Sequence, residues 1–440
     1  MLLLSTTKPI YFKSSPQDHV SPPTSLEHLV FGLGSGMNIW PYRKELVSLY
    51  WNPNKMRGCV FVDSLPNDNK FDTSSLPPLC LSSNTTQFPY NWWGPGGQQS
   101  ANRMARMVKD IVEMNYSNVR WYVFGDDDTI FFPENLVKTL SKYDHRLWYY
   151  LGAHSESYLS SQFFGFGMAF GGGGFAISSS LAKVLAKVID SCLERYSYLY
   201  GSDGRTYSCI TELGVELTQE PGFHQLDVRG NIFGLLAAHP ATPLLSLHHV
   251  DQLDPIFPNM TTIKALQHLF EAANVDSQRT LQQTVCYHKQ FSWTISISWG
   301  YAIQIFPINM PLPDVLRVQL TYNDWTTSRN VLAPLYNFNT IELHPDPCKR
   351  PIIFYQDNVS SRKDGIIMSS YKKSFQNCSH NMALLKELEL IKVFTKKLDL
   401  DIEQLQSPRR HCCDILPSSS NDVMEIATRE CRGEELIFMH

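Results

Sequence analysis

Three consecutive aspartates, Asp126 to Asp128, are the residues in this sequence whose type and spacing first suggest chemistry. They follow the apolar run 121–124 and one glycine, so they come at the end of an expected buried strand. Adjacent carboxylates repel, and a bound cation relieves the repulsion. On an extended exit Asp126 and Asp128 project to the same side, and their oxygens suit Mg²⁺ or Mn²⁺ bridging a diphosphate. A solvated acidic turn or a calcium loop is the alternative.

A run of four glycines, Gly171 to Gly174, precedes an apolar segment and the clearest helical pattern of the chain. Glycines lose much backbone entropy on folding, so four in a row indicate a close approach of the backbone to another group. Gly172, Gly173 and Gly174 are therefore candidates for lining a sugar or phosphate pocket, with a flexible turn as the alternative. The run is no Walker loop, because Lys and Ser/Thr do not follow at the required positions.

Two further positions carry groups that proton transfer or metal binding would need. Asp203 lies in the segment 201–205, where a carboxylate could accept a proton from an attacking hydroxyl, although a helix-ending turn is the commoner reason for such a segment. His248 and His249 follow an apolar run, and a neutral imidazole can complete an aspartate-based Mn²⁺ site. A histidine pair alone is usually structural, so this pair gains weight only from the aspartates.

The elements that would position these groups alternate between strand and helix. Strands are expected at 28–33, 58–63, 121–124 and 147–151, and helices at 43–50, 102–114, from 133, and from 181 to 196. This alternation predicts an α/β fold, an open and mostly parallel sheet with helices on both faces. Ligands of such sheets bind beyond the carboxyl ends of the strands, which is where the aspartates fall.

The pattern changes after about residue 265. Apolar residues occupy every odd position from 291 to 305, which predicts one long, half-buried strand that Gly300 kinks or bulges. We therefore divide the chain into a flexible leader at 1–25, an α/β domain at 26–265 and a β-rich C-terminal extension at 266–440.

Composition excludes several classes of protein. A net charge of −4 without a long basic run argues against nucleic acid and against a polybasic membrane surface as partners. The ten cysteines contain no Cys-x-x-Cys pair, so zinc is not expected, and an oxidising compartment is slightly favoured. Five Asn-x-Ser/Thr sequons lean the same way. No run reaches the roughly 18 residues of a membrane-spanning helix, so an intracellular protein and a luminal one without a visible anchor both stay open.

Several motifs in combination resemble one known family. They read WYVFGDDDT at 121–129, MAFGGGGFAI at 168–177, ELGV at 212–215 and EPGFHQ at 220–225, followed by the segment 233–251. The chain from 121 to 258 resembles the plant Fringe-related glycosyltransferases, a DUF604-type group similar to glycosyltransferase family 31. Weaker similarity at 29–32 and 56–58, and at 298–301, 346–348 and 410–414, extends the resemblance over nearly all of residues 25–431.

The resemblance implies a GT-A-like fold and roles for individual residues. Asp128 would bind the metal, Asp126 and Asp127 would contact the donor sugar, the ribose or the metal, and His249 would be the second protein ligand. Asp203 would be the catalytic base. The family usually has two consecutive acidic residues there, whereas this chain has Asp203 followed by Gly204.

The expected protein is thus an inverting, Mn²⁺- or Mg²⁺-dependent glycosyltransferase. It would move a hexose or N-acetylhexosamine from a UDP-sugar to a hydroxyl of a glycan or glycoprotein, in a β-1,3-type linkage. The alternatives are a catalytically impaired relative that binds nucleotide sugars or glycans, and a calcium-binding adhesion module. The resemblance also implies the Golgi lumen, as a type II membrane protein whose anchor is not visible in this chain.

Overall fold

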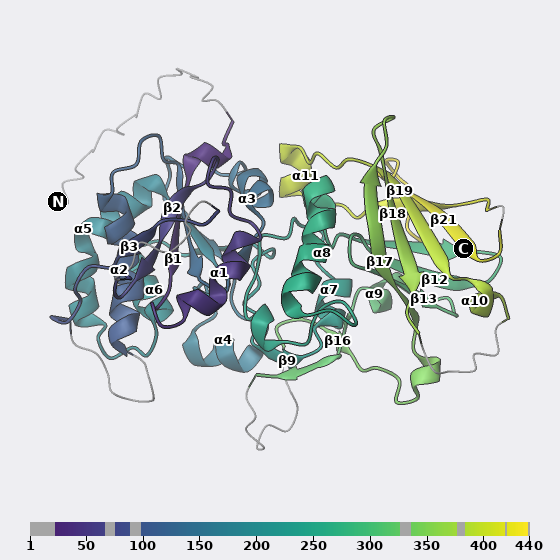
Figure 1. The fold of residues 1–440 in the computed structure, drawn as a ribbon, viewed down its shortest axis with the longest axis horizontal. Helices are drawn as coiled ribbons and strands as arrows, with labels where there is room; N and C mark the ends of the chain where they lie inside the picture. Colours follow the sequence, from purple (N-terminus) through teal and green to yellow (C-terminus); the bar gives the residue numbers. More distant parts are fainter. Residues whose placement is uncertain are drawn as a thin grey trace, which may run out of the picture.

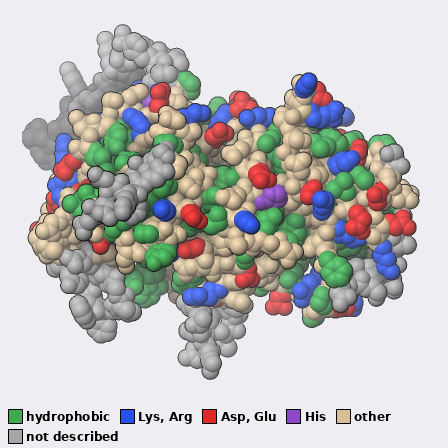
Figure 2. Space-filling model, viewed as in Figure 1, with side chains coloured by type: hydrophobic (Ala, Val, Ile, Leu, Met, Phe, Trp, Pro, Cys, Tyr) green, Lys and Arg blue, Asp and Glu red, His purple; other side chains and the backbone are tan. Residues whose placement is uncertain are grey.

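The structure is a computed structural model that describes residues 23–66, 75–88, 98–325, 336–375, 383–418 and 420–438. Two sheets dominate it, one formed by the first half of the chain and one by the second, with helix α8 (Thr262–Val275) between them (Figure 1). Acidic, basic and hydrophobic side chains are interspersed over the face drawn in Figure 2. The expected leader at 1–25 lies almost entirely outside the described residues.

The first sheet has seven strands in the order β3-β2-β1-β4-β7-β6-β8. All neighbours in it run parallel except the two that flank β7, which is antiparallel to both β4 and β6. The prediction of a mostly parallel sheet is therefore confirmed. Its strands are β1 (Leu29–Gly34), β2 (Arg57–Val62), β3 (Leu79–Leu81), β4 (Trp121–Asp126), β6 (Tyr150–Gly152), β7 (Phe175–Ser178) and β8 (Leu217–Gln219).

Helices cover both faces of this sheet, because side chains alternate along each buried strand. Leu29, Phe31 and Leu33 of β1 belong to a core that includes residues of α1, whereas Val30 belongs to a second core with residues of α2 and α5. The helices of this half are α1 (Trp40–Ser48), α2 (Gln98–Glu113), α3 (Pro133–Leu140), α4 (Tyr158–Phe164), α5 (Ser179–Arg195), α6 (Ser202–Glu212) and α7 (Phe233–Ala237).

The second sheet has eight strands in the order β11-β12-β13-β17-β18-β19-β21-β20. Its two edge strands are joined by the disulfide Cys286–Cys413, so the sheet curls back on itself. This agrees with the expected β-rich C-terminal half. The strands are β11 (Gln283–His288), β12 (Trp293–Ser298), β13 (Ala302–Phe306), β17 (Ile352–Ser361), β18 (Ile366–Lys373), β19 (Leu390–Lys396), β20 (Cys412–Leu416) and β21 (Val423–Arg429).

The single long strand expected over 291–305 is wrong. The segment forms a hairpin of β12 and β13 that turns at residues 299–301, where Gly300 has a φ of 76°. Ile297 pairs with Ile303 and Ile295 with Ile305, and paired residues face the same side of a sheet. The odd positions therefore stay on one face through the reversal, and both strands are fully buried rather than half-buried.

The smaller elements tie the two halves together. Strand β9 (Val228–Gly230) pairs with β15 (Tyr322–Asp324), which places Trp325 beside the first half. The remaining elements are β5 (Ile130–Phe131), β10 (Ser246–Leu247), β14 (Val318–Gln319), β16 (Thr340–Ile341), α9 (Leu312–Val315), α10 (Ala383–Glu387), α11 (Ile402–Gln406), and the short helices at Leu26–His28, Val250–Gln252, Ser277–Arg279 and Pro347–Lys349. The division at residue 265 stays a prediction.

Disulfides join segments within each half of the chain. They join Cys59 to Cys80, Cys192 to Cys209, Cys286 to Cys413 and Cys412 to Cys431, and Cys348 is also disulfide-bonded. The adjacent cysteines Cys412 and Cys413 thus have separate, distant partners. Among the described helices, none is both long and apolar enough to cross a membrane.

Candidate functional site

The three aspartates lie where β4 ends, in a turn held to neighbouring segments. The backbone N–H of Asp127 donates to the carbonyl of Gly34 at the end of β1, at 3.0 Å. The hydroxyl of Thr129 accepts a bond from the N–H of Asp126 and donates to the carbonyl of Gly172. The acidic turn and the glycine run are therefore bonded to each other, although more than forty residues separate them in sequence.

The histidine pair is brought back to this turn by the two-stranded pairing of β5 with β10. Ile130, two residues after Asp128, pairs with Leu247, and His248 follows directly. His249 has a φ of 56°, in the left-handed region that non-glycine residues rarely adopt. Successive side chains of an extended strand point to opposite faces, but this twist turns both imidazoles the same way, with ring centroids 3.6 Å apart. The strained backbone thus makes two adjacent histidines converge.

Asp128, His248 and His249 form a group with metal-ligand geometry. One ligand atom from each lies within 4.8 Å of the others. Asp128 Oδ1 lies 3.2 Å from His248 Nε2, and it, His248 Nδ1 and His249 Nδ1 are buried without a well-formed hydrogen bond. Buried polar atoms without partners are costly, and a cation would satisfy such acceptors. The donor set of one carboxylate and two imidazoles therefore fits a divalent metal.

Two of the three expected ligands, Asp128 and His249, lie in this group. Asp126 lies outside it, with its Oδ2 3.9 Å from His248 Nε2. Its place as a metal ligand stays a prediction. The sequence named His248 only as a member of the histidine pair, because the family resemblance assigns the metal contact to His249.

The charges of the group are strongly coupled. Burial alone would lower the pKa of the His248 imidazolium, but the Asp128 carboxylate raises it to about 9. Burial would raise the pKa of Asp128, but His248 and Arg43 lower it to about 2. Burial raises the pKa of Asp126 to about 7, and burial together with the charge of His248 lowers that of His249 to about 3. Without a metal, His248 is thus the protonated partner of Asp128.

Arg43 of α1 supplies a second positive charge, and no motif in the sequence identifies it. Its guanidinium lies 3.0 Å from Asp127 Oδ1, 3.1 Å from Asp128 Oδ2 and 3.2 Å from Asp251 Oδ2. The other oxygen of Asp127 accepts a hydrogen bond from Ser35 at 2.6 Å. Asp127 is therefore engaged by protein groups on both oxygens, and its contact with a donor substrate stays a prediction. No spacing rule links Arg43 to residues more than eighty positions later.

Close contacts with the candidate groups leave no space for larger residues in the glycine run. A Cβ on Gly171 would stand 2.5 Å from Asp203 Oδ1, and one on Gly172 would stand 2.1 Å from the His248 ring. A Cβ on Gly173 would press on Gln225, and Gly174 has a φ of 86°. The expectation of close backbone approach is confirmed, although what approaches here is protein. Binding of substrate by Gly172, Gly173 and Gly174 stays a prediction.

Asp203 lies in the first turn of α6, at the edge of the same site. Its carboxylate accepts a hydrogen bond from the Ser202 hydroxyl at 2.9 Å and one from the backbone N–H of Gly171. Burial raises its pKa above the ordinary value, against these bonds. A carboxylate with a raised pKa accepts a proton more readily at neutral pH. The two consecutive glycines thus hold the candidate base and a candidate metal ligand against one backbone segment.

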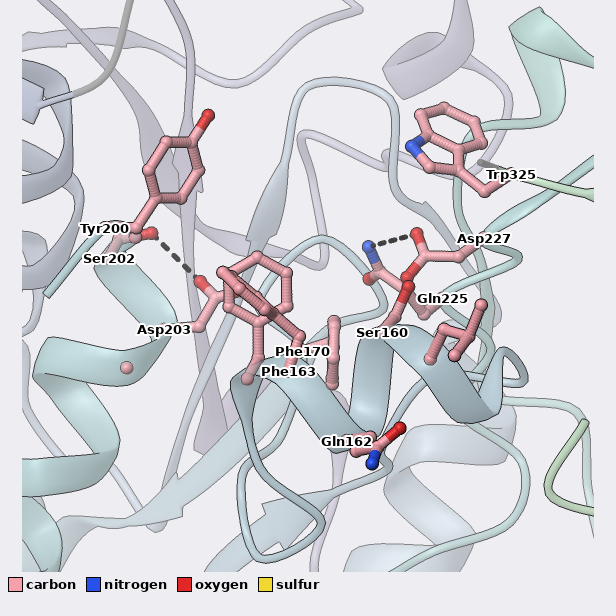
Figure 3. Close-up of a pocket in the computed structure, with 14 residues that line it drawn as sticks. Ser160, Gln162, Phe163, Phe170, Tyr200, Ser202, Asp203, Gln225, Asp227 and Trp325 are labelled. Carbon is pink, nitrogen blue, oxygen red and sulfur yellow. Dashed lines mark hydrogen bonds between the residues drawn. The ribbon is translucent and has the colours of Figure 1, made fainter. Parts of the chain in front are cut away.

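A cavity of about 660 Å³ opens beside Asp203 (Figure 3). Asp203, Ser202 and Tyr200 lie at one side of it, Asp227, Gln225 and Trp325 at the other, with aromatic rings from α4 and from Phe170 between them. Asp227 Oδ1 lies 3.7 Å from His249 Nδ1, and the Trp325 ring stacks on His249 with centroids 4.6 Å apart. The cavity therefore borders the metal group at His249. Asp227 and Trp325 were missed because they carry no motif.

Comparison with known proteins gives a distant structural likeness and a family. The crystal structure of a glycosyltransferase involved in the glycosylation of the major capsid of PBCV-1 is similar over 55% of this chain and 97% of that chain, with 10% identity and a TM-score of 0.29. A likeness this distant carries no argument about function. No curated protein matches the sequence.

The family model for DUF604, described as a protein of unknown function, matches residues 160–413, more than half of the chain. The match spans Asp203, both histidines and the hairpin of the second sheet, and it confirms the DUF604 part of the resemblance. The chain belongs to the DUF604 family.

Proposed function

We propose that this protein is an inverting, metal-dependent glycosyltransferase that uses a UDP-sugar. It moves a hexose or N-acetylhexosamine to a hydroxyl of a glycan or glycoprotein, in a β-1,3-type linkage. The observation that carries the proposal is the convergence of Asp203 and His248 on the adjacent glycines Gly171 and Gly172. One site thereby holds a candidate base and a metal-binding group, as displacement of a diphosphate by a hydroxyl requires.

Asp128, His248 and His249 would hold the metal, and Mn²⁺ suits their mixture of oxygen and nitrogen better than Mg²⁺ does. Such an ion, when bound, neutralises charge that develops on a leaving diphosphate. To hold such an ion His248 would have to be neutral, because only a neutral imidazole has a free lone pair. Arg43 favours the ionised forms of Asp127 and Asp128 and fixes the direction of both carboxylates.

Asp203 would act on the acceptor. Its carboxylate takes the proton of the attacking hydroxyl as the new bond to the anomeric carbon forms and the bond to the diphosphate oxygen breaks. Attack from the face opposite the leaving group inverts the anomeric centre. Gly171 and Ser202 orient the carboxylate by their hydrogen bonds, so it is preorganised for this role.

A screen of UDP-hexoses and UDP-N-acetylhexosamines, with UDP release measured with and without glycan acceptors, tests the proposal. We expect release from at least one donor, stimulated by an acceptor, and a fall in kcat of at least about 100-fold in Asp203→Asn. Exposed Asp364→Asn is the matched control and should leave the rate unchanged. Absence of metal-dependent UDP release from every donor would overturn the proposal.

A second candidate function is a catalytically impaired relative that binds nucleotide sugars or glycans. The observation that favours it is Gly204, which stands where the family usually has a second acidic residue. A Cβ there would meet nothing closer than 3.7 Å, so a side chain fits. If the second acid is the true base, Gly204→Asp raises the transfer rate; if Asp203 is the base, it does not.

We also propose that the protein resides in the Golgi lumen as a type II membrane protein. Its disulfides support this, because they persist in oxidising compartments. Four sequon asparagines, Asn84, Asn115, Asn259 and Asn358, are exposed. Passage through the secretory route should therefore give N-linked glycans, seen as a mobility shift on treatment with an N-glycosidase. Protein that shows no such shift after expression in eukaryotic cells would contradict this localisation.

A further inference from the structure

The cavity beside Asp203 is bounded by a wall of aromatic side chains. Its aromatic wall comes from Phe163 and Phe164 of α4, Phe170 and Tyr200 (Figure 3). Phe163 is 78% exposed and Tyr200 49% exposed, so both rings stand in solvent although apolar side chains are normally buried. Phe164 packs between them, with centroids 4.8 Å from Phe163 and 6.2 Å from Tyr200. The rings thus form a continuous exposed apolar surface at the mouth of a cavity.

The polar groups of the lining are all neutral or acidic. Ser160, Gln162, Ser202 and Gln225 provide hydroxyls and amides, and the charged groups are the carboxylates Asp203 and Asp227. None of the described lining residues is a lysine or arginine. Arg229 is outside the lining; its guanidinium lies 4.6 Å from the Trp325 indole centroid and donates to the Trp325 carbonyl.

This charge pattern decides what the cavity can take. A diphosphate, a uronic acid or a sulfated sugar would bring negative charge next to two carboxylates without a cation to balance it. A neutral pyranose matches every part of the lining. The C–H face of its ring is weakly positive and packs on the negative face of an aromatic ring, while its hydroxyls pair with amides and carboxylates.

We propose that this cavity is the acceptor site and that it selects a neutral saccharide, with its terminal ring on the Phe163–Phe164–Tyr200 wall and a hydroxyl at Asp203. The inference rests on the proposed function, which makes Asp203 the base, and it names the class of acceptor. The donor diphosphate would lie at the metal group, where Arg43 contacts Asp127 and Asp128. Trp325, stacked on His249, stands where the two regions meet.

Saturation-transfer difference NMR on the full chain tests this, with the methyl β-pyranosides of glucose, galactose, xylose, mannose and N-acetylglucosamine against those of glucuronic and galacturonic acid. Each is measured with and without UDP and Mg²⁺. The uronates differ from glucose and galactose only at C6, so each pair isolates the charge. We expect saturation transfer to at least one neutral glycoside and at least fivefold less to its uronate.

The variants Phe163→Ala and Tyr200→Ala should reduce the neutral signal at least fivefold. Phe375→Ala is the matched control, because Phe375 is a 90% exposed aromatic residue of the second half and should leave the signal unchanged. Equal or stronger binding of the uronates, no binding of any neutral glycoside, or a signal that survives Phe163→Ala would overturn the inference.

A parallel calorimetric titration with UDP and Mg²⁺ distinguishes failure of the acceptor assignment from failure of the proposed glycosyltransferase function. UDP binding without neutral-glycoside binding leaves the proposed function standing and overturns the acceptor assignment. Neutral-glycoside binding that depends on Phe163, without any UDP binding, supports the saccharide site and contradicts the transferase.

Discussion

At the scale of single residues, the site is organised by compensation of charge. Asp126 to Asp128 are three adjacent carboxylates, and the sequence could say only that something positive must balance them. Arg43 and a protonated His248 provide that balance. A metal that binds here therefore replaces a proton on His248 and does not enter an uncompensated acidic pocket. Metal affinity at this site should therefore depend on pH.

Metal affinity should rise with pH. The pKa of the His248 imidazolium is raised to about 9 and that of Asp126 to about 7, so below pH 7 both carry protons that oppose a cation. Because His248 must lose its proton to become a ligand, the apparent association constant for Mn²⁺ should increase by up to about tenfold per pH unit between pH 7 and 9. Calorimetry in buffers of different ionisation enthalpy would report the released proton directly.

Both titrations affect folding in the direction opposite to their effect on metal affinity, because each group has a folded pKa above its unfolded value and so lowers the free energy of unfolding as pH rises. His248 has a raised folded pKa, so its contribution to the free energy of unfolding is present below its unfolded pKa and is lost as pH rises towards 9. Asp126 also has a raised folded pKa, because burial disfavours its charged form, and folding is therefore disfavoured as pH rises from about 4 to 7.

A metal affinity that stays constant or falls between pH 7 and 9 would contradict the assignment of His248 as a metal ligand.

At the scale of elements, the site depends on short segments that hold side chains against backbone. The glycine run 171–174 is the clearest case, since its first two members have no space for a Cβ beside Asp203 and His248. The two-residue strands β5 and β10 are the second case, because their pairing returns the histidines to the aspartates. These are packing requirements, and they make a glycine substitution a sharp probe.

Gly172→Ala should weaken metal binding at least about tenfold, because its Cβ would stand 2.1 Å from the His248 imidazole and displace a ligand. Gly204→Ala is the matched control, since its Cβ would meet nothing closer than 3.7 Å. Electron paramagnetic resonance of free Mn²⁺ measures both affinities. Equal metal affinity in the two alanine variants would show that His248 is not a ligand.

Periodicity predicted most elements of the first sheet, because long buried strands and amphipathic helices leave a repeating pattern. Strands β1, β2 and β4 and helices α2, α3 and α5 lie close to their expected positions. It failed at the hairpin of β12 and β13, because pairing Ile297 with Ile303 keeps odd residues on one face. Alternation of apolar residues shows which face of a sheet each residue occupies, but it does not show whether the chain reverses direction.

The site was only partly visible in the sequence for a different reason. Asp128 and Asp203 could be named because they stand in motifs next to predictable elements. Arg43, Asp227 and Trp325 could not, because their roles arise from contacts between segments far apart in the chain. The convergence of His248 and His249 depends on a left-handed φ at His249, which adjacent residues in a sequence do not reveal.

At the scale of the whole molecule, the second half contributes to the site formed by the first. The pairing of β15 with β9 carries Trp325 to His249, and Tyr301 and Ala302, at the start of β13, join a core of the first half. The disulfide Cys286–Cys413 joins the edges of the second sheet and so fixes the body from which this segment extends. We therefore infer that the C-terminal half positions one wall of the acceptor cavity, in addition to packing against the first half.

The central claim is that a divalent metal on Asp128, His248 and His249 binds the diphosphate of a UDP-sugar. Titrating UDP by calorimetry into the wild-type chain, with and without Mn²⁺, tests it most directly. We expect at least about tenfold tighter UDP binding with Mn²⁺, lost in Asp128→Asn and retained in the exposed control Asp364→Asn, with unchanged circular dichroism in both variants. UDP affinity that is equal with and without Mn²⁺, or that survives in folded Asp128→Asn, would contradict it.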